Sequence, residues 1–452
     1  MPLPKQIIDR TLSSSQGEGG YRICEALLDA GFEAWWVGGC VRDILREIIP
    51  QDIDIATNAD PASVAKLFPK CDESAAALGA VVVSHSGYTY EITTYREEHE
   101  LSDGRFPQSV TFTDRQHDAA RRDITINAIY WNPISSELWD PYSGEADLHE
   151  KLIRMIGDPA TRIRHDALRL LRVIRFRALI GGQYHPDTFA ALHGNAKLIS
   201  LLSGGRIAQE LEKTLLGPNP QLAFEDFWET DVIEYLISEL HACKGVAQPS
   251  QAHSEGDVWQ HVMDVIASFT EDHSADVRWA AMFHDIGKPK TFTIDAERIH
   301  FNDHAAVGAK ITKDILGRLQ FSAVRRDKIC WLIEHHMMMG TFESIDNDRK
   351  AHWYYHPWFL ELLQLFWLDI AGSTPSDFSL YERIIEDYNA YLDANPRPKR
   401  PLLSGDEVMK LLGLKPGEEV GRVLKQLHEA QNRKEVSTKK EAENFLRSLK
   451  SG

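Results

Sequence analysis

The first 50 residues combine an amphipathic helix, a buried strand and a turn into a second helix. Apolar residues at positions 27, 28, 30 and 32 recur with helical spacing, and Gly31 provides a C-terminal stop. The apolar run 35–37 predicts a short buried strand, and the pattern over 41–48 predicts the next helix. Gly38 and Gly39 therefore lie in a strand-to-helix turn.

The pattern then changes to the alternation of β-strands. Residues 52–55, DIDI, alternate with period two, which places two carboxylates on one face and two isoleucines on the other. The segments 81–83 and 88–96 flank a turn at 85–87 and predict a β-hairpin that carries Glu91. The first 157 residues are therefore expected to form a mixed sheet with helices.

Helical periodicity dominates the rest of the chain. Residues 163–178, IRHDALRLLRVIRFRA, predict one amphipathic helix with arginines at every third position on one face. The region 180–245 is mostly helical in pattern, with Gly and Pro breaks. Linkers are expected at 248–256 and at 396–401, the latter stiff and basic, before a small helical tail.

Length and composition place the chain among multidomain globular proteins. At 452 residues, two to four domains are expected, and 43% apolar and 26% charged residues are ordinary values. No apolar run approaches the roughly 20 residues of a membrane span, and the N-terminus lacks the apolar segment of a signal peptide. Five scattered cysteines form no CxxC pair, which favours a reducing cytoplasm.

The overall charge and the local charge point in different directions. A net charge of −17 argues against tight binding to long polyanions. Basic side chains nevertheless gather at Arg121-Arg122 and at Arg169, Arg172 and Arg175, and local charge decides where a nucleic acid or a phosphate binds.

The Gly-Gly turn and the paired aspartates together indicate phosphoryl transfer. At Gly38-Gly39 no Cβ prevents the backbone from approaching a phosphate, and a helix start offers its amides. Asp52 and Asp54, two positions apart on a strand, would hold one hard divalent cation, with Glu91 a candidate third carboxylate. A phosphate cradle beside a metal clamp is what nucleotidyl transfer requires.

Five segments carry a family resemblance: GGCVRD, DIDIAT, EITTYR, DGRFP and RRDITINA. They resemble the head of the class II tRNA nucleotidyltransferase and poly(A) polymerase family. The resemblance implies an α+β fold, in which a nucleotidyltransferase palm (a mixed β-sheet with helices) precedes an all-α neck and body. It also implies an attack of a primer 3′-hydroxyl on an α-phosphate, with ATP, CTP and Mg²⁺ as the partners of the head.

The resemblance assigns roles to individual residues. Asp52 and Asp54 would bind catalytic Mg²⁺, with Glu91 as the third acidic residue. Triphosphate and ribose contacts are implied for Gly38, Gly39, Arg42, Arg121, Arg122, Asp123 and, in support of that loop, Asn127. The guanidinium fork of arginine suits a phosphate better than a lysine does.

The segment after residue 163 resembles the base-selecting EDxxR motif of the family. Asp166 would accept from the amine of cytosine or adenine, and Arg169 would donate to the neighbouring ring nitrogen. Uracil and guanine present the opposite pattern, and leaving each buried polar group unpaired costs about 1–3 kcal/mol. Arg172 and Arg175 continue the basic face. His165 replaces the glutamate of the motif, and a histidine can accept from the arginine only through a neutral ring nitrogen.

Other activities within the family stay open. The segment 96–121 is full length for an enzyme that adds CCA, whereas members that add only C have a shortened loop there. The segment LGAVVVSHSGYTYEITTYR, 78–96, looks more like the tRNA branch than the poly(A) polymerase branch. An enzyme that adds only A and a poly(A) polymerase remain alternatives.

The third region carries histidines and aspartates with ligand-like spacing. Imidazole together with carboxylate suits a transition metal such as Mn, Ni, Co or Fe, or Mg²⁺, and not a thiolate zinc site. With HDIGK intact, the set resembles the HD superfamily of metal-dependent phosphohydrolases. The resemblance implies one metal held by His261, His284, Asp285 and Asp369. A second metal would be held by His304 with His335 or His336, and of these two we take His335. A regulatory HD domain is the alternative.

The sequence thus predicts a nucleotidyltransferase head (1–157), a neck and body for base selection and RNA binding (158–247), an all-α HD domain (248–375) and a helical tail (376–452). We expect a cytoplasmic enzyme that adds C and A to the 3′ ends of tRNA, with no membrane partner and with an oligomeric state that the sequence leaves open. A phosphohydrolase with a nucleotide-binding head is the rival from another class.

Overall fold

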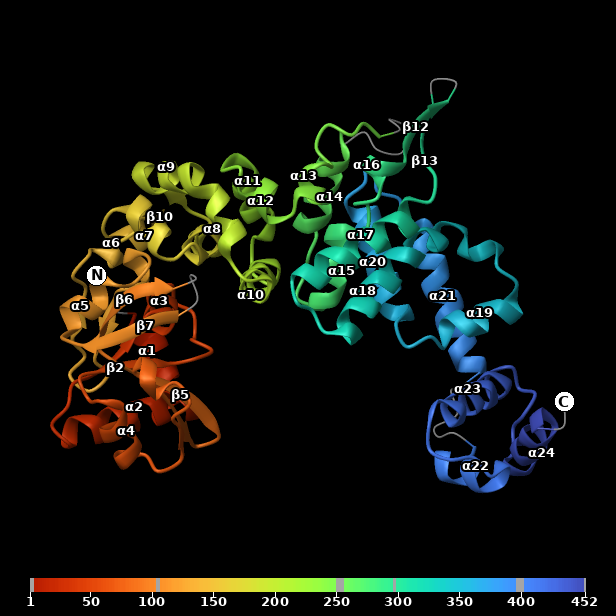
Figure 1. Cartoon of the computed structure of the whole chain (residues 1–452), viewed down its shortest axis with the longest axis horizontal. Helices are drawn as coiled ribbons and strands as arrows, with labels where there is room; N and C mark the ends of the chain where they lie inside the picture. Colours follow the sequence, from red (N-terminus) through yellow and green to blue (C-terminus); the bar gives the residue numbers. More distant parts are fainter. Residues whose placement is uncertain (1–3, 103–105, 249–255, 296–297, 396–401, 451–452) are drawn as a thin grey trace. The chain divides into compact units, whose positions relative to one another are not determined.

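The computed structural model describes residues 4–102, 106–248, 256–295, 298–395 and 402–450 (Figure 1). Residues 103–105 of the DGRFP segment, most of the predicted linker at 248–256, and the predicted basic linker at 396–401 lie outside the described residues. The chain divides into two compact units, Met1–Ala242 with Ile315–Phe321, and Cys243–Asp314 with Ser322–Gly452. Among the described residues, no helix is both long enough and apolar enough to cross a bilayer.

The first unit contains a seven-stranded mixed sheet with the order β3-β4-β5-β2-β1-β8-β9. β2 and β5 are parallel, and the other neighbouring strands are antiparallel. The strands are β1 Ala34–Val37, β2 Asp54–Thr57, β3 Cys71–Asp72, β4 Ala80–His85, β5 Tyr88–Thr94, β8 Tyr130–Trp131 and β9 Leu138–Trp139. The predicted mixed sheet and the β4–β5 hairpin are confirmed.

The two faces of this sheet are buried in different cores. Trp36 and Ile55 belong to the larger core, with the helices that precede β1, whereas Trp35 and Ala56 face a smaller aromatic core that includes Tyr95. Burial on both faces explains why β1 is apolar throughout. The surrounding elements are α1 Lys5–Ser13, α2 Ser15–Asp29, α3 Gly39–Leu45, α4 Pro61–Leu67, η1 Ala76–Leu78, β6 Arg96–Ser102, β7 Phe106–Phe112, α5 Arg115–Ala120, η2 Thr125–Asn127 and α6 Gly144–His149.

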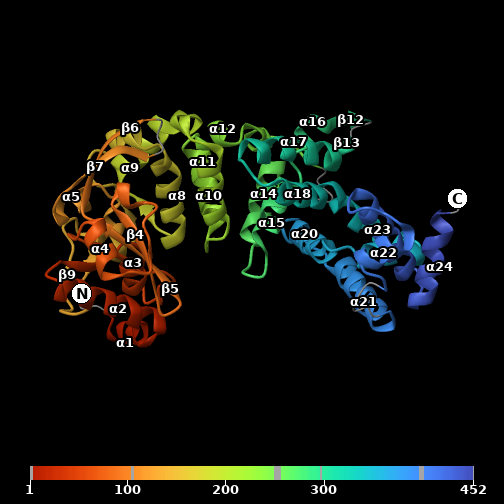
Figure 2. The same cartoon turned by 60° about the horizontal axis from the view of Figure 1, so that its bottom comes forward.

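The rest of the first unit is mostly helical, as predicted, with one pair of short parallel strands. Both α10 and α11 pack along α8, and the three helices run side by side in Figure 2. The elements are β10 Leu152–Ile153, α7 Pro159–His165, α8 Leu168–Ile180, β11 Gln183–Tyr184, α9 Pro186–Asn195, η3 Ala196–Leu201, α10 Gly204–Leu215, α11 Pro220–Glu229, α12 Val232–Leu236 and α13 Ser238–His241.

The prediction of one continuous helix over 163–178 is wrong. α7 ends at His165 and α8 begins at Leu168, because Asp166 adopts an extended backbone with φ −145° and ψ 103°. Its side chain accepts a hydrogen bond from the Leu168 amide (3.1 Å), a local bond that competes with helix continuation. Asp166 and Arg169 therefore do not share the face of one helix.

The second unit is built around a helical core. Its elements are α14 Val258–Ala267, α15 Ala275–Phe283, α16 Lys288–Thr291, β12 Phe292–Asp295, β13 Arg298–Phe301, α17 His304–Arg318, α18 Ala323–His335, η4 His336–Ser344, α19 Asn347–Tyr354, α20 Phe359–Ala371 and α21 Ser379–Ala394. The end of α17, from Ile315, belongs to the first unit. α15 packs against α14, α18 and α20. The tail, α22 Gly405–Leu412, α23 Glu418–Asn432 and α24 Lys439–Lys450, has a core of its own.

Candidate active site and candidate metal centre

The Gly-Gly turn lies where β1 passes into α3, as predicted. Gly38 has φ +76°, and a Cβ placed there would lie 3.4 Å from Nη1 of Arg122. The left-handed conformation and the close guanidinium both favour glycine. A Cβ on Gly39 would lie 3.9 Å from Oδ1 of Asp52. The turn therefore brings bare backbone between an arginine and a carboxylate.

Three carboxylates gather beside this turn. Asp54 opens β2, Glu91 lies opposite it in β5, and Asp52 precedes the strand rather than forming part of it. Burial, together with the negative charges of Asp52 and Glu91, raises the pKa of Asp54 to about 7. All the donors are carboxylate oxygens, which hard cations such as Mg²⁺ prefer, and a bound cation would offset the crowded negative charge.

Arginines surround the carboxylates and are themselves held by polar partners. Arg42 donates to Oδ1 of Asn127 (2.8 Å) and to Oδ1 of Asp43 (2.9 Å). Arg122 donates to the hydroxyl of Tyr130 (3.0 Å), and its pKa is raised. These bonds restrict the two guanidinium groups, and both line the cavity beside the glycine turn.

A buried aspartate supports the RRD segment from behind. Asp118 is fully buried, and its Oδ1 and Oδ2 lie 2.7 and 3.3 Å from the terminal nitrogens of Arg121 and Arg122. Despite burial, these two arginines lower the pKa of Asp118. Sequence reasoning missed Asp118, although its position three and four residues before the arginines on a helical segment was a usable signal.

Asp123 joins the head to α8. Its Oδ2 accepts from Nη2 and Nε of Arg172 at 2.6 and 2.9 Å, and its Oδ1 accepts from Nδ2 of Asn127 (3.1 Å) and the amide of Ile124 (2.9 Å). Although burial alone would raise it, the pKa of Asp123 is lowered, chiefly by Arg172. The ion pair fixes the start of α8 against the loop that carries the predicted phosphate-binding arginines.

The predicted base readers lie at the start of α8. Arg169 donates from Nη1 to the carbonyl of Arg162 (2.8 Å) and from Nη2 to that of Arg121 (3.2 Å). Asp166 lies 3.2 Å from Nη2 of Arg206, and Arg175 pairs with the buried Glu210 at 2.8 Å. The structure thus holds both readers by contacts from elements distant in the sequence.

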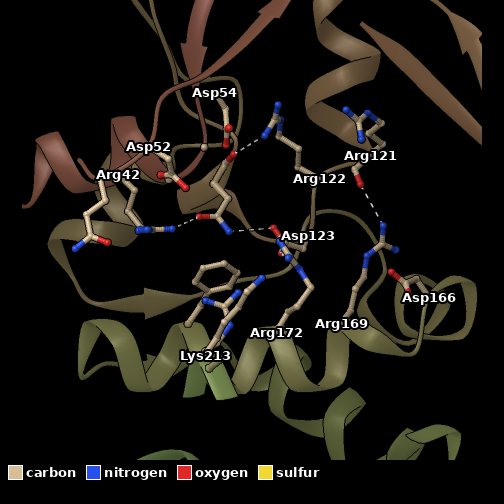
Figure 3. A pocket seen from close by; sticks show the side chains of 16 residues that line it. Arg42, Asp52, Asp54, Arg121, Arg122, Asp123, Asp166, Arg169, Arg172 and Lys213 are labelled. Carbon is tan, nitrogen blue, oxygen red and sulfur yellow. Dashed lines mark hydrogen bonds and ion pairs between the residues drawn. The ribbon is translucent and has the colours of Figure 1, made fainter. Parts of the chain in front are cut away.

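One cavity of about 720 Å³ joins these groups (Figure 3). Every predicted residue of the head and neck site lines it except Glu91, which lies beside Asp54 in the sheet. The lining is Gly38, Gly39, Arg42, Gln51, Asp52, Asp54, Arg121, Arg122, Asp123, Asn127, Asp166, Arg169, Arg172, Arg175, Phe176 and Lys213. Gln51, Phe176 and Lys213 were missed; Lys213 lies on α10, and no local pattern connects it to the site.

The second unit brings four imidazoles together with a common orientation. The Nδ1 atoms of His261, His284, His304 and His336 lie 2.7–3.1 Å from backbone carbonyl oxygens. Each Nε2 then points into the cluster: those of His261 and His284 are 3.2 Å apart, and those of His304 and His336 are 3.3 Å apart. Nδ1–H bonded to a carbonyl leaves Nε2 free as a metal ligand.

Asp285 lies between the two histidine pairs. Its Oδ2 is 3.3 Å from Nε2 of His284, and its Oδ1 is 3.4 Å from Nε2 of His304. Asp369 completes the first pair, with Oδ1 3.1 Å from Nε2 of His261. The ligand atoms of His261, His284 and Asp285, and those of Asp285, His304 and His336, form two groups that each lie within 4.8 Å. Such mixed nitrogen and oxygen donors fit divalent metals.

The choice of His335 as a ligand is corrected by the structure. His335 ends α18, where its Nδ1 lies 2.8 Å from the carbonyl of Trp331 and its ring stacks on that indole. His336, one residue later, is buried in the cluster instead. Burial and the neighbouring His284 lower the pKa of His336 to about 4, so its imidazole is neutral at pH 7, the form that binds metals.

Lys288, which was not predicted as a site residue, is part of this centre. Its Nζ lies 2.6 Å from Oδ2 of Asp285 and donates to Oε1 of Gln248 at 2.6 Å. Burial opposes ionisation of Asp285, but His284 and Lys288 hold its pKa well below the usual range. A cavity of about 610 Å³ opens onto Asp285, His304, His336 and Asp369.

Family models match the chain in three successive parts. Residues 34–154 match the poly(A) polymerase head domain, residues 183–244 match a probable RNA and SrmB-binding site of polymerase A, and residues 257–387 match the HD domain. The head match contains the glycine turn and the three carboxylates. The chain therefore carries the head domain and the RNA-binding segment of polymerase A, followed by an HD domain. Its nucleotidyltransferase head and HD domain both imply the use of divalent metal ions.

The chain is similar to named relatives over part of their length. It is 41% identical over 215 residues to a CCA-adding enzyme of Geobacillus sp. (strain WCH70), which is 47% of this chain and 53% of the relative. It is 42% identical over 230 residues to a CCA-adding enzyme of Limosilactobacillus fermentum, 51% of this chain and 56% of the relative. The chain thus spans about half the length of the curated relatives it matches.

Solved structures of CCA-adding enzymes share the fold of this chain. A Bacillus stearothermophilus CCA-adding enzyme in complex with CTP matches with a TM-score of 0.64 at 24% identity, covering 96% of this chain and 97% of that one. A Thermotoga maritima CCA-adding enzyme complexed with tRNA matches with a TM-score of 0.57 at 19% identity, covering 98% of both chains. The predicted α+β architecture, with a helical body and an HD domain, is confirmed.

Proposed function

We propose that this protein adds C and A nucleotides to the 3′ ends of tRNA, with CTP and ATP as substrates. The observation that carries the proposal is the single cavity of about 720 Å³, which joins acidic, phosphate-binding and base-reading side chains. Similar chains are named CCA-adding enzymes. An A-adding enzyme or a poly(A) polymerase is the alternative within the family.

The chemistry follows from charge. Mg²⁺ bound by Asp52, Asp54 and Glu91 would offset charge at the α-phosphate and the departing pyrophosphate. Arg42 and Arg122 would bind the triphosphate oxygens, since hydrogen bonds already restrict both guanidinium groups near the glycine turn. The bare backbone at Gly38 and Gly39 lets the phosphates approach. Bound in this way, the nucleotide is positioned for attack without a covalent intermediate on the protein.

Base choice would come from protein side chains. Asp166 accepts from the exocyclic amine of C or A, and Arg169 donates to the ring nitrogen beside it. Both side chains line the same cavity as Asp52 and Asp54, so one nucleotide can contact the base readers and the metal-binding carboxylates together. The ribose, the phosphates and the loop between the carboxylates and the base readers would be supported by Arg121, Asp123, Asn127, Arg172 and Arg175.

The test is nucleotide incorporation by the purified full-length protein with Mg²⁺. Three tRNA substrates, ending before the CCA, after its first C and after its second C, are each given labelled CTP or ATP. Addition of C followed by A supports the proposal. Addition of A alone to the CC end indicates an A-adder, long A tails indicate a poly(A) polymerase, and no addition refutes nucleotidyl transfer.

The metal centre of the second unit supports a second candidate function, phosphate-ester hydrolysis. His261, His284, Asp285 and Asp369 would hold one ion, and His304 with His336 a second, with Asp285 between them. Mn²⁺, Ni²⁺, Co²⁺, Fe²⁺ or Mg²⁺ would supply Lewis-acid activation of a phosphate ester. Release of phosphate or opening of a cyclic phosphate under Ni²⁺ or Mn²⁺ tests it. A loaded protein that hydrolyses neither would favour a regulatory HD domain.

We further propose that these activities divide at the predicted boundaries, with transfer in 1–157, base selection and RNA binding in 158–247, metal chemistry in 248–375 and a tail in 376–452. A cytoplasmic location is supported by the five cysteines, none of which forms a disulfide in the described structure.

A further inference from the structure

The carboxylate of Asp166 depends on tertiary contacts for its position, because its backbone lies between two helices. Its Oδ1 accepts two hydrogen bonds, one from the amide of Leu168 (3.1 Å) and one from Nη2 of Arg206 (3.2 Å). For Oδ2 the structure shows no hydrogen bond from the described residues. Two donors on one oxygen orient the carboxylate plane and leave the other oxygen as an acceptor.

Arg206 reaches Asp166 from the first turn of α10. This helix is anchored against α8 by other residues, since Ile207 and Leu211 are buried and Glu210 pairs with Arg175. Nη1 of Arg206 is buried and has no hydrogen-bond partner among the described residues. A buried unpaired donor is unfavourable for stability, so the placement of this side chain is better explained by what it does to Asp166.

Arg169, the second base reader, is also held in place, although the glutamate of the family motif is absent. Arg169 donates to the carbonyls of Arg162 and Arg121, whereas the side chain of His165 is exposed. Residue 165 stands where the motif has glutamate. The arginine therefore has fixed acceptors that do not depend on the side chain at position 165.

We propose that Arg206 is a positioning residue for base selection, which fixes Asp166 in a chain whose motif glutamate is replaced by His165. This inference rests on the proposed nucleotide addition. The guanidinium donates to Oδ1 and orients the carboxylate, with Oδ2 available to the amine of cytosine or adenine. Uracil and guanine would place a carbonyl oxygen against it, so discrimination follows from repulsion as well as attraction.

The test measures equilibrium binding of CTP, UTP, ATP and GTP to the full-length protein without tRNA, in parallel with incorporation. Arg206→Gln keeps most of the side-chain length and removes the charge, and should reduce the preference for CTP over UTP about tenfold. Arg206→Lys restores the charge and should recover most of that preference. His165→Ala is the matched control and should leave it unchanged.

The outcomes separate the two claims. The role of Arg206 is overturned if Arg206→Gln keeps the wild-type preference for CTP over UTP. It is also overturned if this variant binds all four nucleotides equally more weakly, because a merely structural contact would produce that result. A wild type without any preference would overturn it as well. A wild type that prefers CTP in binding but adds nothing to tRNA would refute the proposed addition and leave the role of Arg206 in base choice standing.

Discussion

The ion pair between Asp123 and Arg172 should be a main contact that holds α8 against the head. Asp123 is only 7% exposed, and its Oδ2 accepts from both Nε and Nη2 of Arg172. Arg172→Met preserves most of the side-chain stem but leaves this oxygen buried and without its cationic partner. Breaking a buried pair in this way destabilises by about 3–5 kcal/mol.

The loss of stability here should lie at or below the lower end of that range. Asp123 keeps its bonds to Asn127 and to the Ile124 amide, and the side chain of Arg172 is 33% exposed, so water replaces part of the lost interaction. We expect a loss of about 2–3 kcal/mol in local stability. This corresponds to amide exchange that is faster by about 30- to 150-fold in the opened segment.

Hydrogen-exchange mass spectrometry on peptides that cover 118–132 and 168–180 measures this loss locally. Because Asp123 is left as a buried charge, the double variant Asp123→Asn with Arg172→Met should be less destabilised than Arg172→Met alone. Arg164→Met, on the exposed side of α7, is the surface control and should change protection by less than about 0.5 kcal/mol.

The effect should also depend on pH, with a defined sign. The lowered pKa of Asp123 means that its contribution is present above the unfolded value of about 3.9 and is lost as the pH falls through the folded value. In Arg172→Met the pKa of Asp123 rises, so the difference from wild type is largest at neutral pH and shrinks on acidification. Unchanged protection at pH 7, or a double variant no better than the single one, would refute the reasoning.

Three further predictions concern the two sites. Asp52→Ala should abolish incorporation of both C and A while hydrolysis by the second unit persists; loss of both activities would argue against separate sites. Arg169→Ala should relax the choice between CTP and UTP more than it weakens triphosphate binding, as measured by nucleotide titration, and an unchanged preference would contradict base reading by this side chain. His336→Ala should weaken binding of a second Mn²⁺ or Ni²⁺ by about 10- to 100-fold in a metal titration, whereas the neighbouring control His335→Ala should not.

Local patterns in the sequence are enough to locate most of the chemistry. The glycine turn after β1, the acidic pair and the hairpin that carries Glu91 are set by contacts within a few residues, and the structure contains each of them. The HDIGK segment likewise makes His284 and Asp285 candidate metal ligands through its resemblance to the HD superfamily. Short-range periodicity predicts the local backbone conformation, and the glycine turn, the acidic pair and the hairpin depend on that conformation.

What the sequence could not decide is which side chains from distant elements converge. It did not distinguish His336 from His335, because one residue along the end of a helix turns a side chain by about 100° and only packing selects the buried one. It predicted a continuous helix at Asp166, where a local hydrogen bond and Arg206, 40 residues away, hold an extended residue instead. The sequence by itself determined the chemical groups and their elements; the tertiary structure decided their partners, because partners far apart in the chain leave no periodic trace in it.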